Sequence, residues 1–522
     1  TFGMGFTAGY VGIISQVKFF MTEFDKDTVA HKLEFQASDT DSDSDYTTLF
    51  TVGGDVHEGW NYYNYDEDDV LRYRYYRFKG AEVGTCNVGE FALVGVEAID
   101  DSSTSLDCFP ELVLNGVSHD LLNVATYEDS VTPLLESISP RFGTVEGGTL
   151  VTFTGSGFPS DPALVTISID ERPCTINSAS STEVTCTTSD RPGYYPNTRL
   201  DFLIQDQGRV STRGLLFRYV NLWSSAVTWG GEDPPAGGDT VWIPEGMHLL
   251  MDADSTPVLN LVLIEGSLIF APDADPNHHR TFDATYIFVQ GGYLEVGTEE
   301  HHYSSKLTIT MHGDKDTTEI PIYGVKVTAV RDGILELHGT PRNPTWTSLE
   351  TTSESGSNTI TLNTEVDWVA GEVIVIAPTS YENYEAEVRT IASIDKSNVN
   401  NPVITLNETL LYKHYAGVET YGSDTLEMRA EVGLLTRNVI YRGDPETSGK
   451  NRFGAHIMLH SHGDESLEGR IEYCEFFDVG QAFQLGRYPI HFHLIGQVTK
   501  SYIRGNAIHN TYNRAVTIHD VS

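Results

Sequence analysis

Two histidines at alternate positions, His491 and His493, are the side chains of this sequence best placed to do chemistry. Ile490 and Phe492 alternate with them, which predicts a strand with both imidazoles on one face and both apolar side chains on the other. Arg487 stands just before this strand. Imidazoles in this arrangement can bind a metal, hold a sugar or transfer a proton, and they can equally form a packed ladder of polar side chains.

The segment around this pair is rich in titratable residues, since seven of the 18 histidines fall between positions 456 and 519. Cleavage of a glycosidic bond needs two carboxylates beside the bond, or a base and a cation for elimination next to a uronic acid. We favour the packed ladder, followed by a sugar or metal site without turnover, and then catalysis. The further candidates for catalytic roles are Asp478, Arg514, His519 and Asp520.

A second candidate site is an acidic loop near the beginning of the chain, with aspartates at every other position. Calcium binds six to eight oxygens, and a loop of this kind can supply several of them. The alternative is a solvated acidic loop with no ligand. Calcium is the one cofactor that the sequence suggests, and its candidate ligands are Asp39, Asp41, Asp43 and Asp45.

The five cysteines fall into two closely spaced pairs and a single residue, which predicts two disulfides and one free thiol. Disulfides form in oxidising compartments, so the expected location is extracellular or at the cell surface. The sequon Asn407-Glu-Thr is a candidate N-glycosylation site, which suits the same location. The predicted disulfides are Cys86–Cys108 and Cys174–Cys186, and the predicted free thiol is Cys474.

The charge balance excludes some partners. Against 33 lysines and arginines the chain has 74 aspartates and glutamates, for a formal charge of −41. Such a chain repels nucleic acid and anionic membranes, and it repels polyanionic sugars within a screening length of about 8–10 Å. The excess is uneven, because residues 1–132 hold 7 basic and 24 acidic residues while 470–522 hold 5 and 4. The histidine-rich segment is therefore nearly neutral.

No apolar run reaches the roughly 18 residues of a membrane span, and no basic and apolar leader opens the chain. The last residues stop within a repeating pattern. We therefore expect a fragment of a longer protein, with membrane contact only through flanking regions that this sequence lacks.

The elements that must position these residues are strands, because no apolar period of 3.6 residues is sustained anywhere. We expect an all-β chain with helix below about a tenth of residues, against a typical third. Residues 1–132 contain YRYYRFKG (73–80) and are similar to discoidin-like jelly rolls. Residues 133–220 contain SPRFGTVEGGT (139–149) and resemble an IPT/TIG domain, an immunoglobulin-like sandwich in which Cys174 and Cys186 stand where that family commonly has a disulfide.

The second half of the chain is organised in short strands between glycine corners. Residues 221–345, with GGDTVWIPEG (237–246), resemble the eight-glycine (G8) domain and suggest successive layers of a sheet. Residues 346–522 are predicted to form a right-handed parallel β-helix that is incomplete at its C-terminal end. The segments 471–477 and 503–509 carry aliphatic residues in matching phase, as stacked rungs would.

The run GRYPIHFH (486–493), with 475–481 before it and 502–519 after it, carries a family resemblance. It is similar to the fibrocystin-like proteins and to the family of the cell-migration-inducing hyaluronan-binding protein. The second resemblance implies Arg487, His491 and His493 as catalytic residues of a hyaluronan-like polysaccharide depolymerase, either hydrolase or lyase. A TIG domain ahead of a G8 domain is the fibrocystin-like arrangement, and those proteins share the run without an established enzymatic activity.

The combined prediction is a structural or adhesive element of a large cell-surface or appendage protein. Its expected partners are extracellular glycans or cell-surface proteins, and rung-like ends would allow self-association into filaments. The depolymerase is the alternative function, and we lean away from an enzyme.

Overall fold

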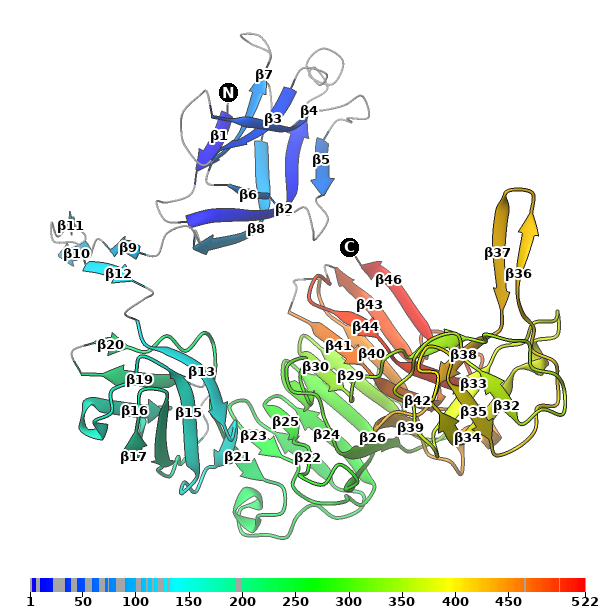
Figure 1. Cartoon of the computed structure of the whole chain (residues 1–522). Helices are drawn as coiled ribbons and strands as arrows, with labels where there is room; N and C mark the ends of the chain where they lie inside the picture. The colour runs from blue at the N-terminus through cyan, green and yellow to red at the C-terminus, as the bar shows by residue number, and fades with distance from the viewer. Residues whose placement is uncertain are drawn as a thin grey trace. The chain divides into compact units, whose positions relative to one another are not determined.

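The computed structural model describes residues 132–521 except 194–198, 206, 464–465 and 497. Of the first 131 residues it describes strands β1–β12 and residues 45–46. The chain divides into two compact units, Thr1–Pro133 and Leu134–Ser522, and both are built from strands (Figure 1). The helical elements of the described part are one four-residue helix and three single 3-10 turns, which agrees with the expected scarcity of helix.

In the first unit the strands pair antiparallel. β2 (Tyr10–Met21) pairs with β5, β6 and β8, and β7 (Tyr75–Gly80) lies between β1 and β3. Val17, Phe35 and Tyr76 are fully buried there. The jelly-roll order of these strands stays a prediction. The other strands are β1 Phe2–Gly5, β3 Leu33–Ser38, β4 Thr47–Thr51, β5 Gly59–Asn64, β6 Leu71–Tyr73, β8 Glu90–Ile99, β9 Ser105–Cys108, β10 Glu111–Leu114, β11 Val117–Asp120 and β12 Ala125–Glu128.

The second unit begins with a seven-stranded antiparallel sheet in the order β13-β15-β18-β17-β16-β19-β20. Gly147, with φ +79°, lies in the turn before β15, and a Cβ there would lie 2.5 Å from the Ser189 backbone. The predicted disulfide Cys174–Cys186 joins β17 to β18. The elements are β13 Leu134–Ser139, β14 Phe142–Thr144, β15 Leu150–Ser156, η4 Pro162–Leu164, β16 Val165–Ile169, β17 Arg172–Ala179, β18 Glu183–Thr188, β19 Leu200–Ile204, β20 Gly208–Arg209 and β21 Arg218–Leu222.

A parallel β-helix follows. One of its sheets runs β14-β21-β23-β25-β27-β30-β41-β44, and the other stacks β45-β42-β39-β28-β26-β29-β40-β43-β46. Its elements are η5 Ala226–Trp229, β22 Thr240–Ile243, β23 His248–Leu250, β24 Leu259–Ile264, β25 Ser267–Phe270, β26 His279–Gln290, β27 Tyr293–Val296, β28 Lys306–Met311, β29 Val327–Arg331, β30 Ile334–His338, β39 Val439–Gly443, α1 Ser448–Asn451, β40 His456–His460, β41 Glu468–Glu472, β42 Cys474–Val479, β43 Ile490–Gly496, β44 Tyr502–Arg504, β45 Ala507–Thr511 and β46 Val516–Val521.

The G8 segment, for which the sequence suggests successive layers of a sheet, forms the first rungs of this β-helix. Its strands β28, β29 and β30 pair in parallel with β39, β40 and β41 from the end of the chain. Sequence periodicity identifies strands and corners but does not say whether successive strands stack as layers or as rungs.

The glycines of this segment stack at one corner of the rungs. A Cβ on Gly292 would lie 2.4 Å from the Ile264 carbonyl oxygen and 2.7 Å from that of Gly266. A Cβ on Gly333 would lie 2.7 Å from the Gly292 carbonyl oxygen. Only glycine leaves room for the backbone of the rung below, which explains why these corners carry no side chain.

We therefore expect Gly292→Ala to lower the free energy of unfolding by about 1–3 kcal/mol, because the methyl group must displace two backbone carbonyls. Urea denaturation measures the change. Gly237→Ala is the matched control, since the nearest atom to its new methyl group lies 3.7 Å away. Equal stability of the two variants would contradict a steric origin for the glycine corner.

Residues 346–435 form an antiparallel insertion, which corrects the prediction of a continuous β-helix over 346–522. Its six strands run β31-β38-β33-β34-β35-β32 around a separate core that includes the fully buried Trp368, and β36 and β37 form a hairpin. The β-helix resumes at β39. The strands are β31 Trp346–Ser348, β32 Thr359–Thr361, β33 Val373–Ile376, η6 Asn383–Glu385, β34 Glu387–Asp395, β35 Val403–Leu406, β36 Ala416–Tyr421, β37 Asp424–Arg429 and β38 Glu431–Leu434.

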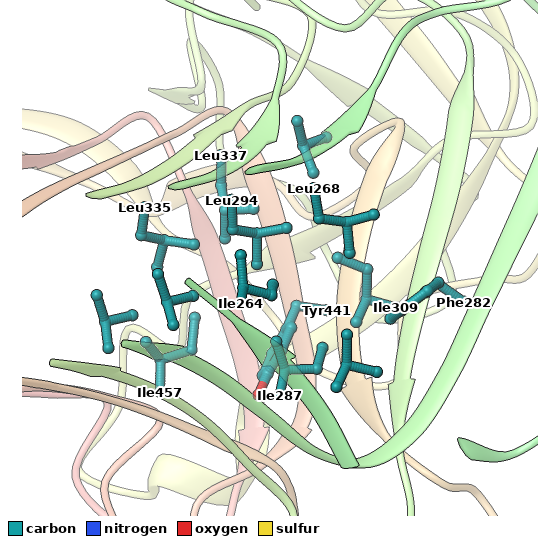
Figure 2. Packing of buried hydrophobic residues seen from close by; sticks show 14 of the residues in the cluster. Ile264, Leu268, Phe282, Ile287, Leu294, Ile309, Leu335, Leu337, Tyr441 and Ile457 are labelled. Atoms are coloured by element: carbon teal, nitrogen blue, oxygen red, sulfur yellow. The ribbon is translucent and has the colours of Figure 1, made fainter. Parts of the chain in front are cut away.

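The inside of the β-helix is a continuous apolar core. Figure 2 shows Leu294 and Leu335 facing Ile287 and Ile457 across this interior. Cys474 lies in the same core as a buried free thiol, as predicted. Among the described residues, no helix has the length and apolar content that crossing a bilayer requires.

Candidate functional site

Three neighbouring rungs, β40, β43 and β46, bring histidines into one column on the outside of the β-helix. β43 begins directly after Pro489, and its Ile490 and Phe492 side chains are buried in the core. His491 and His493 lie on the opposite face, as their alternation predicts. In the parallel register His493 pairs with His460 on one side and with His519 on the other.

His491, His493 and His519 converge on one point. The Nε2 atoms of His491 and His519 are 3.0 Å apart, and Nδ1 of His493 is 3.0 Å from the same Nε2 of His519. Three ring nitrogens, one from each residue, lie within 4.8 Å of one another. His491 is buried, whereas 41% of the His519 side chain is exposed, so the cluster opens to solvent on one side.

The other ring nitrogens of two of these histidines are fixed by acceptors. Nδ1 of His491 donates to the carbonyl oxygen of Gly486 at 2.9 Å, and Nδ1 of His519 donates to the carboxylate of Asp520 at 3.1 Å. The Tyr488 ring packs edge-on against His491 with centroids 5.0 Å apart. These contacts hold the imidazoles in one orientation.

Burial disfavours the charged form of the histidines on β40 and β43. It lowers the pKa of His491 to about 4, with the Gly486 carbonyl opposing the shift. Burial also lowers the pKa of His493 and of His460. Nδ1 of His460 lies 3.1 Å from the Tyr323 hydroxyl, and its ring lies 5.3 Å from that of His493. At neutral pH His460, His491 and His493 are therefore uncharged imidazoles, which are good ligands and poor general acids.

The structure brings His491 and His493 together, and the Arg487 guanidinium bonds to residues outside the histidine cluster. The Arg487 guanidinium donates to the Ile322 carbonyl at 2.7 Å and lies 3.6 Å from Glu319. A Cβ on Gly324 would lie 2.4 Å from its Nε, so the arginine packs flat against that glycine. The catalytic role of Arg487, His491 and His493 that the resemblance implies stays a prediction.

The remaining acid and base candidates are also dispersed. Asp478 accepts a hydrogen bond from the Tyr512 hydroxyl at 2.6 Å. Asp520 is the carboxylate that contacts the histidine cluster among the described residues. Glycoside hydrolysis needs a pair of carboxylates across the sugar, and the described part of this cluster supplies one.

A second cluster is built from His302, His338 and Glu472. His338 is buried between Glu336 and Glu472, and its Nδ1 lies 2.8 Å from the Glu472 carboxylate. Burial opposes a charge on this ring, but the hydrogen bonds to the two glutamates outweigh it and raise the pKa of His338. Arg504 also binds Glu472. Every polar group named here has a partner within the protein, which indicates a structural network.

A cleft of about 860 Å³ lies between the TIG sheet and the β-helix within the second unit. Arg141 and Arg218 reach Glu295 beneath it at 3.5 and 3.0 Å, and Glu295 is buried. The side chains that line the cleft are mostly charged or aromatic. Among them are Glu136, Arg213, Tyr293, Glu299, Lys500 and Tyr502.

The other predicted site residues are only partly described. Asp39, Asp41, Asp43 and Cys86 lie outside the described residues, so the calcium loop and the Cys86–Cys108 disulfide stay predictions. Asp45 is exposed. Asn407 is exposed directly after β35, a position open to a glycan. Sequence reasoning missed His460 and Tyr323, because the register that places them beside His493 comes from distant parts of the chain.

Three family models match this chain. They are the IPT/TIG domain over residues 133–219, the G8 domain over 228–350 and the CEMIP beta-helix over 452–522. Among solved structures, a tailspike of the Pseudomonas phage phi297 has 10% identity and a TM-score of 0.17, covering 48% of this chain and 39% of the tailspike. A likeness this low carries no argument about function.

Curated relatives give closer matches. Human fibrocystin-L (Homo sapiens) is 39% identical over 434 residues, which is 76% of this chain and 10% of the relative. A G8 domain-containing protein of Dictyostelium discoideum is 33% identical over 57% of this chain and 25% of the relative. Mouse fibrocystin (Mus musculus) is 25% identical over 66% of this chain and 9% of the relative.

The chain thus spans about a tenth of the length of fibrocystin-L. The order of its domains, TIG followed by G8 and the β-helix, agrees with the fibrocystin-like resemblance of the sequence. Over the 76% of it that aligns, this chain is a homologue of fibrocystin-L, with the TIG, G8 and β-helix domains of that family.

Proposed function

We propose that this chain is a rigid, extracellular glycan-binding element of a cell-surface protein, and that the cleft between the TIG sheet and the β-helix is its binding site. The observation that carries the proposal is the continuous parallel ladder β14-β21-β23, which joins the TIG domain to the first rungs of the β-helix. The Arg141–Glu295 and Arg218–Glu295 pairs add two contacts across the same junction. Because these contacts hold the walls of the cleft in place, the protein loses little conformational entropy when a ligand binds.

The lining of the cleft suits a sugar. Tyr293 and Tyr502 supply aromatic surface, on which pyranose rings pack, and Arg213, Lys500, Glu136 and Glu299 supply donors and acceptors for hydroxyl groups. A volume of about 860 Å³ lies within the range of ligand pockets, about 300–1,000 Å³, and admits a short oligosaccharide. The mixture of charges avoids the strong repulsion that the overall charge of −41 imposes elsewhere.

The proposal predicts that a double substitution at the rim of the cleft weakens binding at least tenfold. Arg213 is exposed and 71% of the Lys500 side chain is exposed, so Arg213→Ala with Lys500→Ala removes ligand contacts at little cost in stability. The measurement is binding to an array of extracellular glycans with and without calcium, followed by titration of the best ligand.

The matched control is Lys315→Ala with Lys413→Ala, which changes the net charge equally at exposed positions that do not line the cleft. The control pair should bind as the unchanged chain does. If both double variants bind the glycan equally weakly, binding depends on the net charge and not on the cleft. If no glycan on the array binds the unchanged chain, glycan binding is refuted.

A further inference from the structure

We infer that His491, His493 and His519 form a binding site for a divalent transition-metal ion of the zinc type. The three ring nitrogens come from adjacent rungs and approach one another at 3.0 Å in two of their pairs. Nitrogens that bind one tetrahedral zinc ion at about 2.0–2.1 Å are separated by about 3.3 Å. Small rotations of the imidazoles therefore convert the observed cluster into a three-histidine metal site.

The tautomers supply an independent reason for a cation at this point. The Gly486 carbonyl and the Asp520 carboxylate can only accept hydrogen bonds, so the facing Nδ1 atoms of His491 and His519 carry the protons. When each of the two rings carries a single proton, their Nε2 atoms present lone pairs to each other at 3.0 Å. If Nδ1 of His493 carries a proton, it can donate that proton to Nε2 of His519 in a hydrogen bond. The buried Nε2 of His491 then still faces Nε2 of His519 without a proton between them. A metal ion at this point satisfies all three nitrogens.

The contacts behind the ligands match those of known metal centres. Metal-binding histidines usually donate their second ring nitrogen to a backbone carbonyl or a carboxylate, which raises the basicity of the ligand and fixes its direction. The backbone carbonyl of Gly486 accepts the hydrogen bond from His491, and the carboxylate of Asp520 accepts the one from His519. The rungs themselves are rigid, because β43 hydrogen-bonds to a neighbouring strand on each side.

The ligand set determines the class of metal. Three imidazoles favour zinc, copper or nickel, whereas calcium and magnesium require oxygen ligands. The exposure of 41% of the His519 side chain leaves room for a water molecule as the fourth ligand. The His302, His338 and Glu472 cluster differs, because ion pairs and hydrogen bonds within the protein already occupy both ring nitrogens of its buried His338.

The test uses the whole chain, stripped with a chelator and then titrated with zinc chloride. We expect one zinc ion per chain by elemental analysis after dialysis, and a visible absorption spectrum of tetrahedral type when cobalt(II) replaces zinc. His493→Gln should weaken zinc binding at least 100-fold and abolish that spectrum. His493 is the preferred variant because its side chain is only partly buried, so the chain should still fold.

His462→Gln is the matched control, since this histidine belongs to the same segment, has a 63% exposed side chain and bonds to Asp332 instead. It should retain the zinc ion and the cobalt spectrum. Absence of stoichiometric metal on the unchanged chain would overturn the inference and leave a proton-sharing histidine cluster. Equal zinc affinity of the His493→Gln and unchanged chains would also overturn it.

Discussion

Replacing Asp444 with asparagine is expected to lower the free energy of unfolding by about 3–5 kcal/mol, because the substitution leaves the buried ammonium of Lys326 without its counter-charge. Lys326 is fully buried, and its Nζ lies 2.6 Å from the Asp444 carboxylate. The same ammonium donates to the hydroxyls of Thr447 and Ser448, both at 2.9 Å. These neutral acceptors cannot compensate for the loss of the negative charge.

The position of this pair explains why the effect should be large. Lys326 immediately precedes β29 in the G8 part of the β-helix, and Asp444 follows β39 after the antiparallel insertion. The pair therefore joins rungs that are far apart in the sequence. Asp444 also accepts from the backbone nitrogen of Thr447 at 2.9 Å, which shapes the turn into α1.

Guanidinium denaturation measures the loss, and a double-mutant cycle assigns it to the pair. Lys326→Met with Asp444→Leu should be less destabilised than Lys326→Met alone or Asp444→Leu alone, because no buried charge remains unpaired. Asp316→Asn is the control at an exposed pair with Lys315, where a change within about 0.5 kcal/mol is expected. Additive single losses in the double variant would refute the coupling.

Short stretches of the sequence were sufficient to predict features that depend only on neighbouring residues, such as which side chains of a strand are buried. Alternation predicted the buried and outward faces of β43. The antiparallel insertion was missed because alternation along β33 is the same for a parallel and an antiparallel neighbour. Strand direction is set by partners such as β34 and β38, and the sequence of one strand does not specify them.

The candidate site was also predicted only where its geometry is local. Alternation places His491 and His493 on one face of a strand, whereas the residues beside them belong to other rungs, which the sequence does not specify. His460, His493 and His519 share a register position although unequal numbers of residues separate them, because the loops between rungs differ in length. Arg487 stands close to the histidines in sequence, but its guanidinium donates to the carbonyl of Ile322, 165 residues earlier. The sequence near Arg487 therefore could not predict this partner.

The buried His456 should make the chain sensitive to acid. Its Nε2–H donates to the Tyr323 carbonyl at 2.9 Å, and the Gln481 side-chain amide donates to its Nδ1 at 3.3 Å, so the neutral ring is fully hydrogen-bonded. Burial lowers the pKa of His456 to about 3, against about 6.5 in an unfolded chain. Between these values the unfolded chain binds one proton more than the folded chain. The contribution of His456 to stability is therefore complete above about pH 6.5 and falls by about 1.4 kcal/mol per pH unit as the pH decreases toward 3.

Urea denaturation of the metal-free chain at pH 7 and at pH 4.5 measures this dependence as the difference between variants. His456→Gln should lower stability at pH 7 through lost packing and hydrogen bonds, but its stability should fall less on acidification, by about 2–3 kcal/mol, because the substituted residue binds no proton. His462→Gln, which removes an exposed histidine of the same segment, is the matched control. Parallel pH dependences of the unchanged chain and His456→Gln would mean that His456 accepts a proton while folded. The hydrogen bonds to Tyr323 and Gln481 argue against that result, because a protonated ring would turn a second N–H toward the donating amide of Gln481.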